Sequence, residues 1–250
     1  MKALPSLALV VAASIALPAC PPNPVNPRSL PGAWNEAQAR VVALAVAKSW
    51  QFPADPDIQK DRQASVYAVL PFDQVGVPGW LVLVAVVPAS FTCHACAPVT
   101  GGVLFTRKGE VWQASFDQAH VLRLGANGRP PGARSESLGP NQPAAAFEMD
   151  AMAQGYQGST LTLVSQWQGK LTEVLSLQTQ ADNGAAGLPE AETFHWQAHV
   201  EVLPGSNAGY FDLRLTYSGT KASVDGNKLS PYTGSTVYRF RDGSYSPLTQ

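Results

Sequence analysis

The stretch Trp80–Val87 (WLVLVAVV) is an unbroken apolar run rich in β-branched residues, and it constrains the fold more than any other segment. Such a run is typical of a central strand that is covered on both faces. Its neighbours also have strand patterns: Ser65–Phe72 before it, and a hairpin over Gly101–Phe116 that turns at Lys108-Gly109. The sequence therefore predicts that Trp80–Val87 is a central strand of a sheet.

The C-terminal half alternates apolar and polar residues, as half-buried strands do. In TFHWQAHVEV (193–202) the aromatic and aliphatic residues occupy every second position, and YFDLRLTYSG (210–219) repeats the pattern. Hairpins are expected near Gly169 and over Asp242-Gly243, where glycine permits a tight turn. This half of the chain is predicted to be almost entirely β.

One helix is expected near the N-terminus, within Gly32–Phe52. Asn35 is a suitable N-cap, Glu36 falls in the first turn, and Pro53 ends the element. The apolar face expected to pack on the sheet consists of Ala37, Val41, Leu44 and Ala45, widened by Val42, Val46 and Trp50.

The predicted fold class is α+β, with one N-terminal helix packed on a mostly antiparallel sheet and then a β-rich C-terminal half. Between the halves, a stretch rich in Pro, Gly and Ser is expected to be a loop. The expected regions are a signal peptide (1–19), a Pro-rich tether (20–32), an α+β region (33–130), a loop or linker (131–147) and a β-rich region (148–250), the last compatible with one domain continuous with 33–130.

Composition excludes some partners. Of the 250 residues, 45% are hydrophobic and 14% are charged, which indicates a globular chain. The net charge is −1 and no basic run is present, so binding to nucleic acid by neutralising phosphates is not expected.

The first twenty residues, MKALPSLALVVAASIALPAC, combine Lys2 with a short apolar core and a small-residue ending. They resemble a bacterial signal peptide, and Leu17-Pro18-Ala19-Cys20 resembles the lipobox of bacterial lipoproteins. That resemblance implies export, lipidation at Cys20 and a cell-envelope protein held on a membrane by its N-terminal lipid. Cleavage after Ala19 without lipidation is the alternative, and it would give a soluble periplasmic or secreted protein. The prolines that follow Cys20 form a stiff tether.

Cys93-His94-Ala95-Cys96 is the stretch most suggestive of chemistry. If Cys20 is lipidated, Cys93 and Cys96 are the remaining pair, and in an oxidising compartment a disulfide between them is expected. A C-x-x-C motif resembles that of thioredoxin-like oxidoreductases, whose first cysteine lies at a helix N-terminus. Here Gly101-Gly102 and an apolar run follow, which indicates a turn and a strand. A bound metal ion is another alternative, with Cys93, His94 and Cys96 as three ligands and a fourth from elsewhere.

A second candidate surface lies on the polar face of the strand at 194–202, where His195, Gln197, His199 and Glu201 alternate with the apolar residues. They could line a binding surface, although histidines four apart on a strand are too distant to share a metal ion. A hydrolase site that uses either histidine with a distant serine and carboxylate also stays open.

The body of the chain loosely resembles uncharacterised exported bacterial proteins that carry a C-H-A-C turn, and this implies no activity. The leading hypothesis is a non-catalytic binding or structural module of the cell envelope, with no cofactor and with an envelope ligand or protein as partner. The alternative is a thiol-redox or metal-handling protein that uses Cys93, His94 and Cys96.

Overall fold

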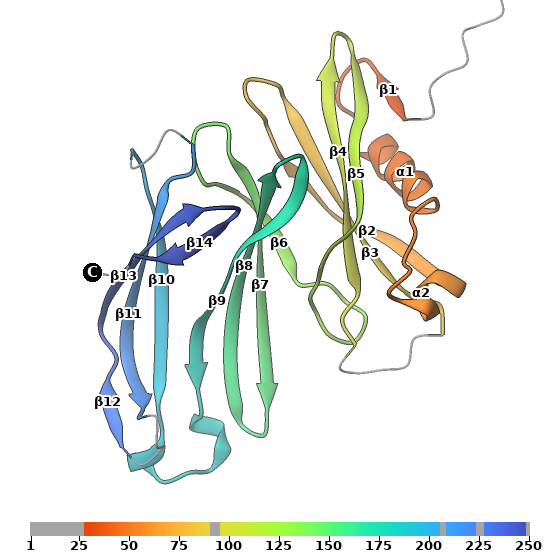
Figure 1. Cartoon of the computed structure of the whole chain (residues 1–250). Helices are drawn as coiled ribbons and strands as arrows, with labels where there is room; N and C mark the ends of the chain where they lie inside the picture. Colours follow the sequence, from red (N-terminus) through yellow and green to blue (C-terminus); the bar gives the residue numbers. More distant parts are fainter. Residues whose placement is uncertain (1–27, 91–95, 206–208, 224–227, 249–250) are drawn as a thin grey trace, which may run out of the picture.

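The computed structural model describes residues 28–90, 96–205, 209–223 and 228–248. Among these residues, strands account for 61% and helices for 11%, so the expected α+β class is met only loosely and the protein is mostly β-sheet. Two sheets, both antiparallel throughout, are packed face to face, and the helices lie on the far side of the smaller sheet (Figure 1).

The smaller sheet has five strands in the order β1-β5-β4-β3-β2. Its elements, with the two helices packed on it, are β1 (Ser29–Pro31), α1 (Glu36–Ala47), α2 (Pro56–Lys60), β2 (Arg62–Pro71), β3 (Gly79–Pro88), β4 (Val99–Lys108) and β5 (Val111–Arg123).

The larger sheet has nine strands in the order β14-β13-β11-β10-β9-β8-β7-β6, with β12 paired to β11 off this path. Its strands are β6 (Gly132–Ser137), β7 (Pro143–Ala153), β8 (Tyr156–Trp167), β9 (Lys170–Asp182), β10 (His195–Leu203), β11 (Asp212–Ala222), β12 (Leu229–Pro231), β13 (Gly234–Arg241) and β14 (Ser244–Pro247), with short 3₁₀ helices at Gly184–Ala186 and Glu190–Glu192.

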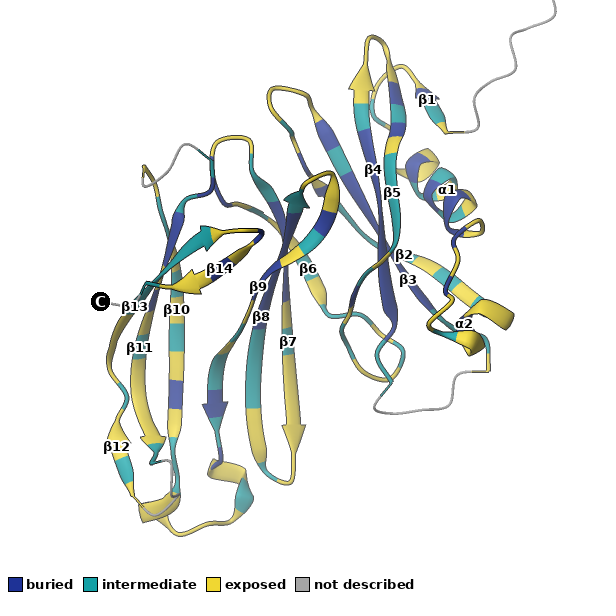
Figure 2. Ribbon diagram, viewed as in Figure 1, coloured by how far each residue is buried: buried dark blue, intermediate teal, exposed yellow. Residues whose placement is uncertain are grey.

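The central-strand prediction for Trp80–Val87 is confirmed. In β3, Val82, Val84 and Val86 pack in the cluster that contains α1, and Leu81 and Leu83 pack in the cluster shared with β7 and β8 of the larger sheet. All five side chains are fully buried. Because successive side chains of a strand point to opposite faces, one apolar run fills two cores (Figure 2).

Helix α1 begins as predicted, since the Asn35 side chain accepts a hydrogen bond from the Gln38 N–H at 3.0 Å. The expected packing face is wrong in part: Val41 is 68% exposed, and the buried helical residues are Ala39, Ala43, Val46 and Ala47. Small side chains let the helix approach the sheet closely, so the alanines face inward although Val41 is more hydrophobic.

Gly101 and Gly102 lie inside β4, so the turn expected there is wrong. A Cβ on Gly101 would be 2.3 Å from the Trp50 ring, and a Cβ on Gly102 would be 2.6 Å from the Leu171 side chain. The absence of a side chain at the two glycines thus lets Trp50 pack against one face of the sheet and Leu171 against the other. Glycine within a strand commonly marks such a close approach.

The alternation predicted for the C-terminal half is confirmed. Trp196, Leu213 and Leu215 are buried. The hairpins expected near Gly169 and Asp242-Gly243 are present, with both central residues of each turn at positive φ (47° and 76°; 50° and 90°). The larger sheet curls, so that its terminal strand β14 also contacts β9. Side chains from β7, β8, β11 and β14 accordingly share one buried cluster.

The stretch 131–147 is not the expected loop, because it contains β6 and the start of β7, paired in register from Gly132 opposite Glu148 to Ser137 opposite Pro143. Strand β6 is an edge strand with few apolar residues, so it lacks the alternation that marks a half-buried strand. Its flanking prolines and glycines indicated a loop but only mark its ends. Within the described ranges, no helix is long and apolar enough to cross a membrane.

Candidate functional site

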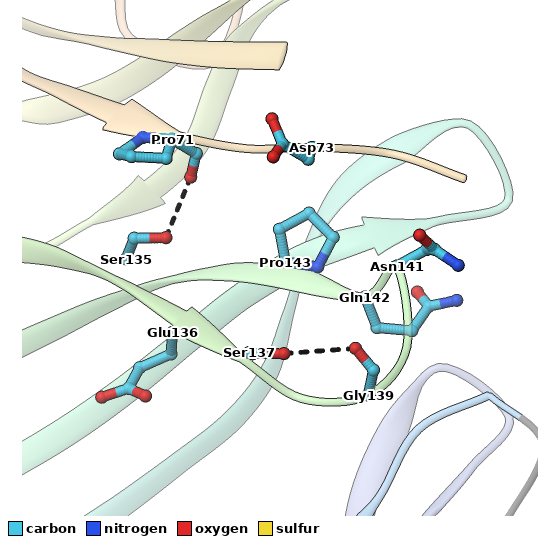
Figure 3. Close-up of a pocket in the computed structure, with 9 residues that line it drawn as sticks. All are labelled: Pro71, Asp73, Ser135, Glu136, Ser137, Gly139, Asn141, Gln142 and Pro143. Atoms are coloured by element: carbon cyan, nitrogen blue, oxygen red, sulfur yellow. Dashed lines mark hydrogen bonds between the residues drawn. The ribbon is translucent and has the colours of Figure 1, made fainter. Parts of the chain in front are cut away.

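A hollow of about 400 Å³ opens where the two sheets meet (Figure 3). One wall is the end of β2 and the residues just after it, and the other is β6 with the turn into β7. The lining combines polar side chains with two proline rings, and it consists of Pro71, Asp73, Ser135, Glu136, Ser137, Gly139, Asn141, Gln142 and Pro143.

Side chains of the hollow hold its two walls together. The Ser135 hydroxyl in β6 donates to the carbonyl oxygen of Pro71 at 2.9 Å and so links the sheets directly. The Asp73 carboxylate accepts a hydrogen bond from the Gly79 N–H at 2.9 Å and fixes the loop that follows β2. The backbone is therefore anchored on both sides of the opening.

The polar groups that remain can serve a ligand. Ser135 and Ser137 donate their protons to main-chain oxygens, which leaves their hydroxyl oxygens as acceptors. Among the described residues, no group forms a hydrogen bond with the side-chain amides of Asn141 and Gln142. Each amide offers both donors and an acceptor. Asn141 has a φ of 59°, a left-handed turn conformation that asparagine tolerates.

The predicted binding surface on β10 stays a prediction, but its four residues do share one face. His195, Gln197, His199 and Glu201 are all exposed and lie on the outward face of the strand. His195 Nδ1 lies 2.9 Å from an Asp182 carboxylate oxygen, and Arg214 donates to Glu201 at 3.3 Å. The pKa of Asp182 is lowered, chiefly because its carboxylate accepts the Gly184 N–H and secondarily because His195 is adjacent.

The hydrolase alternative gains nothing from these contacts. In the part of the chain that the structure describes, no serine forms a hydrogen bond with His195 or His199. The two histidines share an exposed face, only His195 of the two has a side-chain partner among the described residues, and neither lines the hollow between the sheets.

Cys20, Cys93 and His94 lie outside the described residues, so the lipidation, the disulfide and the three-ligand metal site all stay predictions. Cys96 lies shortly before β4, and its carbonyl oxygen accepts the Gly128 N–H at 3.1 Å. Across residues 28–90, 96–205, 209–223 and 228–248, no group of three or more His, Cys, Asp or Glu side chains is placed to hold a metal ion.

A cluster of tyrosines with a nearby lysine lies on the inner face of the larger sheet. Tyr217 and Tyr232 have ring centroids 4.7 Å apart, and the Lys221 ammonium lies 4.7 Å from the Tyr232 ring centroid. Burial raises the pKa of Tyr238 to about 12, and the neighbouring Tyr217 hydroxyl contributes to the increase.

Sequence reasoning missed the hollow because its walls come from segments more than sixty residues apart in the chain. The local signal is the turn composition of Gly139-Pro140-Asn141, which by itself predicts a loop or linker. Comparisons with protein-family models, with curated proteins and with solved structures found no match for this chain.

Proposed function

We propose that this protein is a non-catalytic binding module of the cell envelope, held on a membrane through lipidated Cys20, and that the hollow between its sheets binds a saccharide. The single observation that supports this most is the pair of unpartnered amides, Asn141 and Gln142, at the edge of a hollow that also contains the Asp73 carboxylate. The envelope location comes from the sequence of the first twenty residues.

A saccharide matches the chemistry of the lining. Sugar hydroxyls both donate and accept hydrogen bonds, and amides and serine hydroxyls offer the complementary groups. The Asp73 carboxylate accepts the Gly79 N–H with one oxygen and keeps further acceptor sites for a hydroxyl, whereas Glu136 is ion-paired with Arg134. The rings of Pro71 and Pro143 supply apolar surface for the C–H faces of a sugar.

Saturation-transfer difference NMR with a panel of neutral hexoses and N-acetylhexosamines tests the proposal. Binding by at least one sugar is expected, and Gln142→Ala should weaken it by about tenfold, the loss of roughly one to two hydrogen bonds. Gln197→Ala, an exposed glutamine on the outward face of β10, is the matched control and should bind as the unaltered protein does. Saturation transfer abolished by Gln197→Ala but not by Gln142→Ala would assign the site to β10 instead.

The anchor has a separate test, because the mature protein should carry a diacylglyceryl group on Cys20. Intact-mass measurement of membrane-extracted protein should show this addition, and Cys20→Ser should release the protein from the membrane. Unmodified Cys20 at the mature N-terminus would contradict the anchor and leave a soluble exported protein. The same spectra, recorded with thiol alkylation, report whether Cys93 and Cys96 are oxidised.

A further inference from the structure

A groove of about 410 Å³ lies between α1 and β2, on the opposite side of the smaller sheet from the larger one. Its lining is mostly apolar and combines one face of the helix with the start of the strand: Val41, Leu44, Ala45, Ala47, Lys48, Arg62 and Ala64. Val41, which is 68% exposed, stands at its rim. This is the helix face that was expected to be buried, and no described element covers it.

The floor of this groove runs into an open sheet edge. Strand β2 is the last strand of the five-stranded sheet and pairs only with β3. The Asp61 carbonyl accepts the Ala89 N–H at 3.2 Å, so residue 61 is turned toward the β3 side. The Val66 carbonyl is turned away from β3, because it accepts a hydrogen bond from Arg40 of the helix.

Main-chain groups alternate in direction along a strand, so Arg62 and Ala64 share the orientation of Val66. Their N–H and C=O groups therefore face the open edge, immediately beside the apolar groove. Among the described residues, no backbone group pairs with them there. An added strand would find free hydrogen-bonding groups at this edge and an apolar surface for alternate side chains.

The charges beside the groove are positive at one end. Lys48 and Arg62 both line it, and the described residues offer neither of them a carboxylate partner. Arg62 instead donates to the carbonyl oxygens of Lys48 and Trp50 at 2.8 and 3.0 Å, which places its guanidinium at the C-terminal end of α1. At the other end, Arg40 is neutralised by Glu36 at 2.8 Å.

We propose that this groove binds the C-terminal segment of a partner protein as an extended strand, antiparallel to β2, with alternate apolar side chains against Val41 and Leu44. Antiparallel pairing places the C-terminal end of the added strand beside Arg62, where β2 begins. The terminal carboxylate then lies near Lys48 and Arg62. This interaction surface is separate from the saccharide hollow and does not depend on it.

Fluorescence anisotropy with an N-terminally labelled hexapeptide of alternating Thr and Val, ending in a free carboxylate, tests the proposal on the mature protein. Saturable binding is expected, with several-fold weaker binding of the C-terminally amidated peptide. Val41→Asp should weaken binding about tenfold or more. Met152→Asp, at a side chain that is 67% exposed in β7 of the other sheet, is the matched control and should leave binding unchanged.

Two further variants separate the edge from the charge. Ala64→Pro removes an edge-facing N–H without touching the ladder to β3, and proline is tolerated on edge strands, so it should weaken both peptides about equally. Lys48→Gln should reduce the preference for the free carboxylate over the amide, because only Arg62 then remains beside the terminal carboxylate. Thermal unfolding of each variant checks that it is folded.

Absence of saturable binding would overturn the proposal, as would an equal loss with Met152→Asp or a carboxylate preference that is undiminished in Lys48→Gln. Sedimentation of the unliganded protein covers the remaining occupant. A concentration-dependent dimer that Ala64→Pro abolishes would show that a second copy of this chain occupies the edge, and would also overturn the proposal.

Discussion

Strand β3 of the five-stranded sheet and strand β10 of the nine-stranded sheet differ in how many of their faces are buried. In the five-stranded sheet, β3 is covered on both faces, and its Val82, Leu83 and Val84 have no exposed surface. In the nine-stranded sheet, β10 buries Trp196 on its inner face and exposes His199 on the other. Strand β3 is therefore part of the buried scaffold, whereas β10 leaves one face open to solvent.

The largest effect is expected where the two sheets share a core. Phe147 of β7 is fully buried in the cluster that also contains Phe72, Leu81 and Leu83. Phe147→Ala should lower the free energy of unfolding by about 3–5 kcal/mol, because it removes a large side chain and leaves a cavity. Denaturant unfolding should still show one transition for both sheets.

His199→Ala on the exposed face of β10 is the control for Phe147→Ala, and it should change the free energy of unfolding by no more than about 0.5 kcal/mol. If Phe147→Ala separated the unfolding into two transitions, the sheets would be independent units and the shared core would contribute little.

A smaller loss is expected within the scaffold. Gly101→Ala in β4 would bring a Cβ to 2.3 Å from the Trp50 ring and 2.8 Å from the Ala119 carbonyl oxygen. Overpacking of this kind should cost about 1–3 kcal/mol in denaturant unfolding. Gly132→Ala in the edge strand β6 would meet no atom within 4 Å, and it should be close to neutral. Equal losses in the two variants would contradict the tight double packing of β4.

The smallest effect is expected at the tyrosines of the larger sheet, where stability should fall at high pH. Burial and the Tyr217 hydroxyl raise the pKa of Tyr238 from 10.0 to about 12, so the folded state favours the protonated phenol. This contribution to stability is complete below pH 10 and is lost as the pH rises toward 12. Tyr217→Phe should lower the pKa of Tyr238 in an ultraviolet titration but leave it above 10.0, because burial is the larger cause. An unchanged pKa would show that the two hydroxyls are not coupled.

Local sequence patterns predicted the features that depend on neighbouring residues: strand alternation, hairpin turns and the start of the helix. The period-two alternation around Trp196 and Leu213 identified β10 and β11 and the face that each buries, and Gly169 and Gly243 marked two hairpins. Asn35 identified the start of α1.

Features that depend on tertiary packing were missed. The face of α1 follows from how closely the helix approaches the sheet, which hydropathy at Val41 does not report. Edge strand β6 carries too few apolar residues to show a strand pattern. The hollow is lined by Asp73 and Gln142, which are brought together only by the packing of the two sheets. No local sequence pattern predicts that packing.

The most direct test is to measure amide hydrogen–deuterium exchange with and without a bound saccharide. It asks whether β3 is the buried scaffold and whether the sugar binds at the junction of the two sheets. The prediction is that β3 exchanges slowest in both states, and that the sugar slows exchange only in peptides covering 70–80 and 132–146. Exchange in β3 as fast as in β10, or protection by the sugar on β10 and β11 alone, would contradict it.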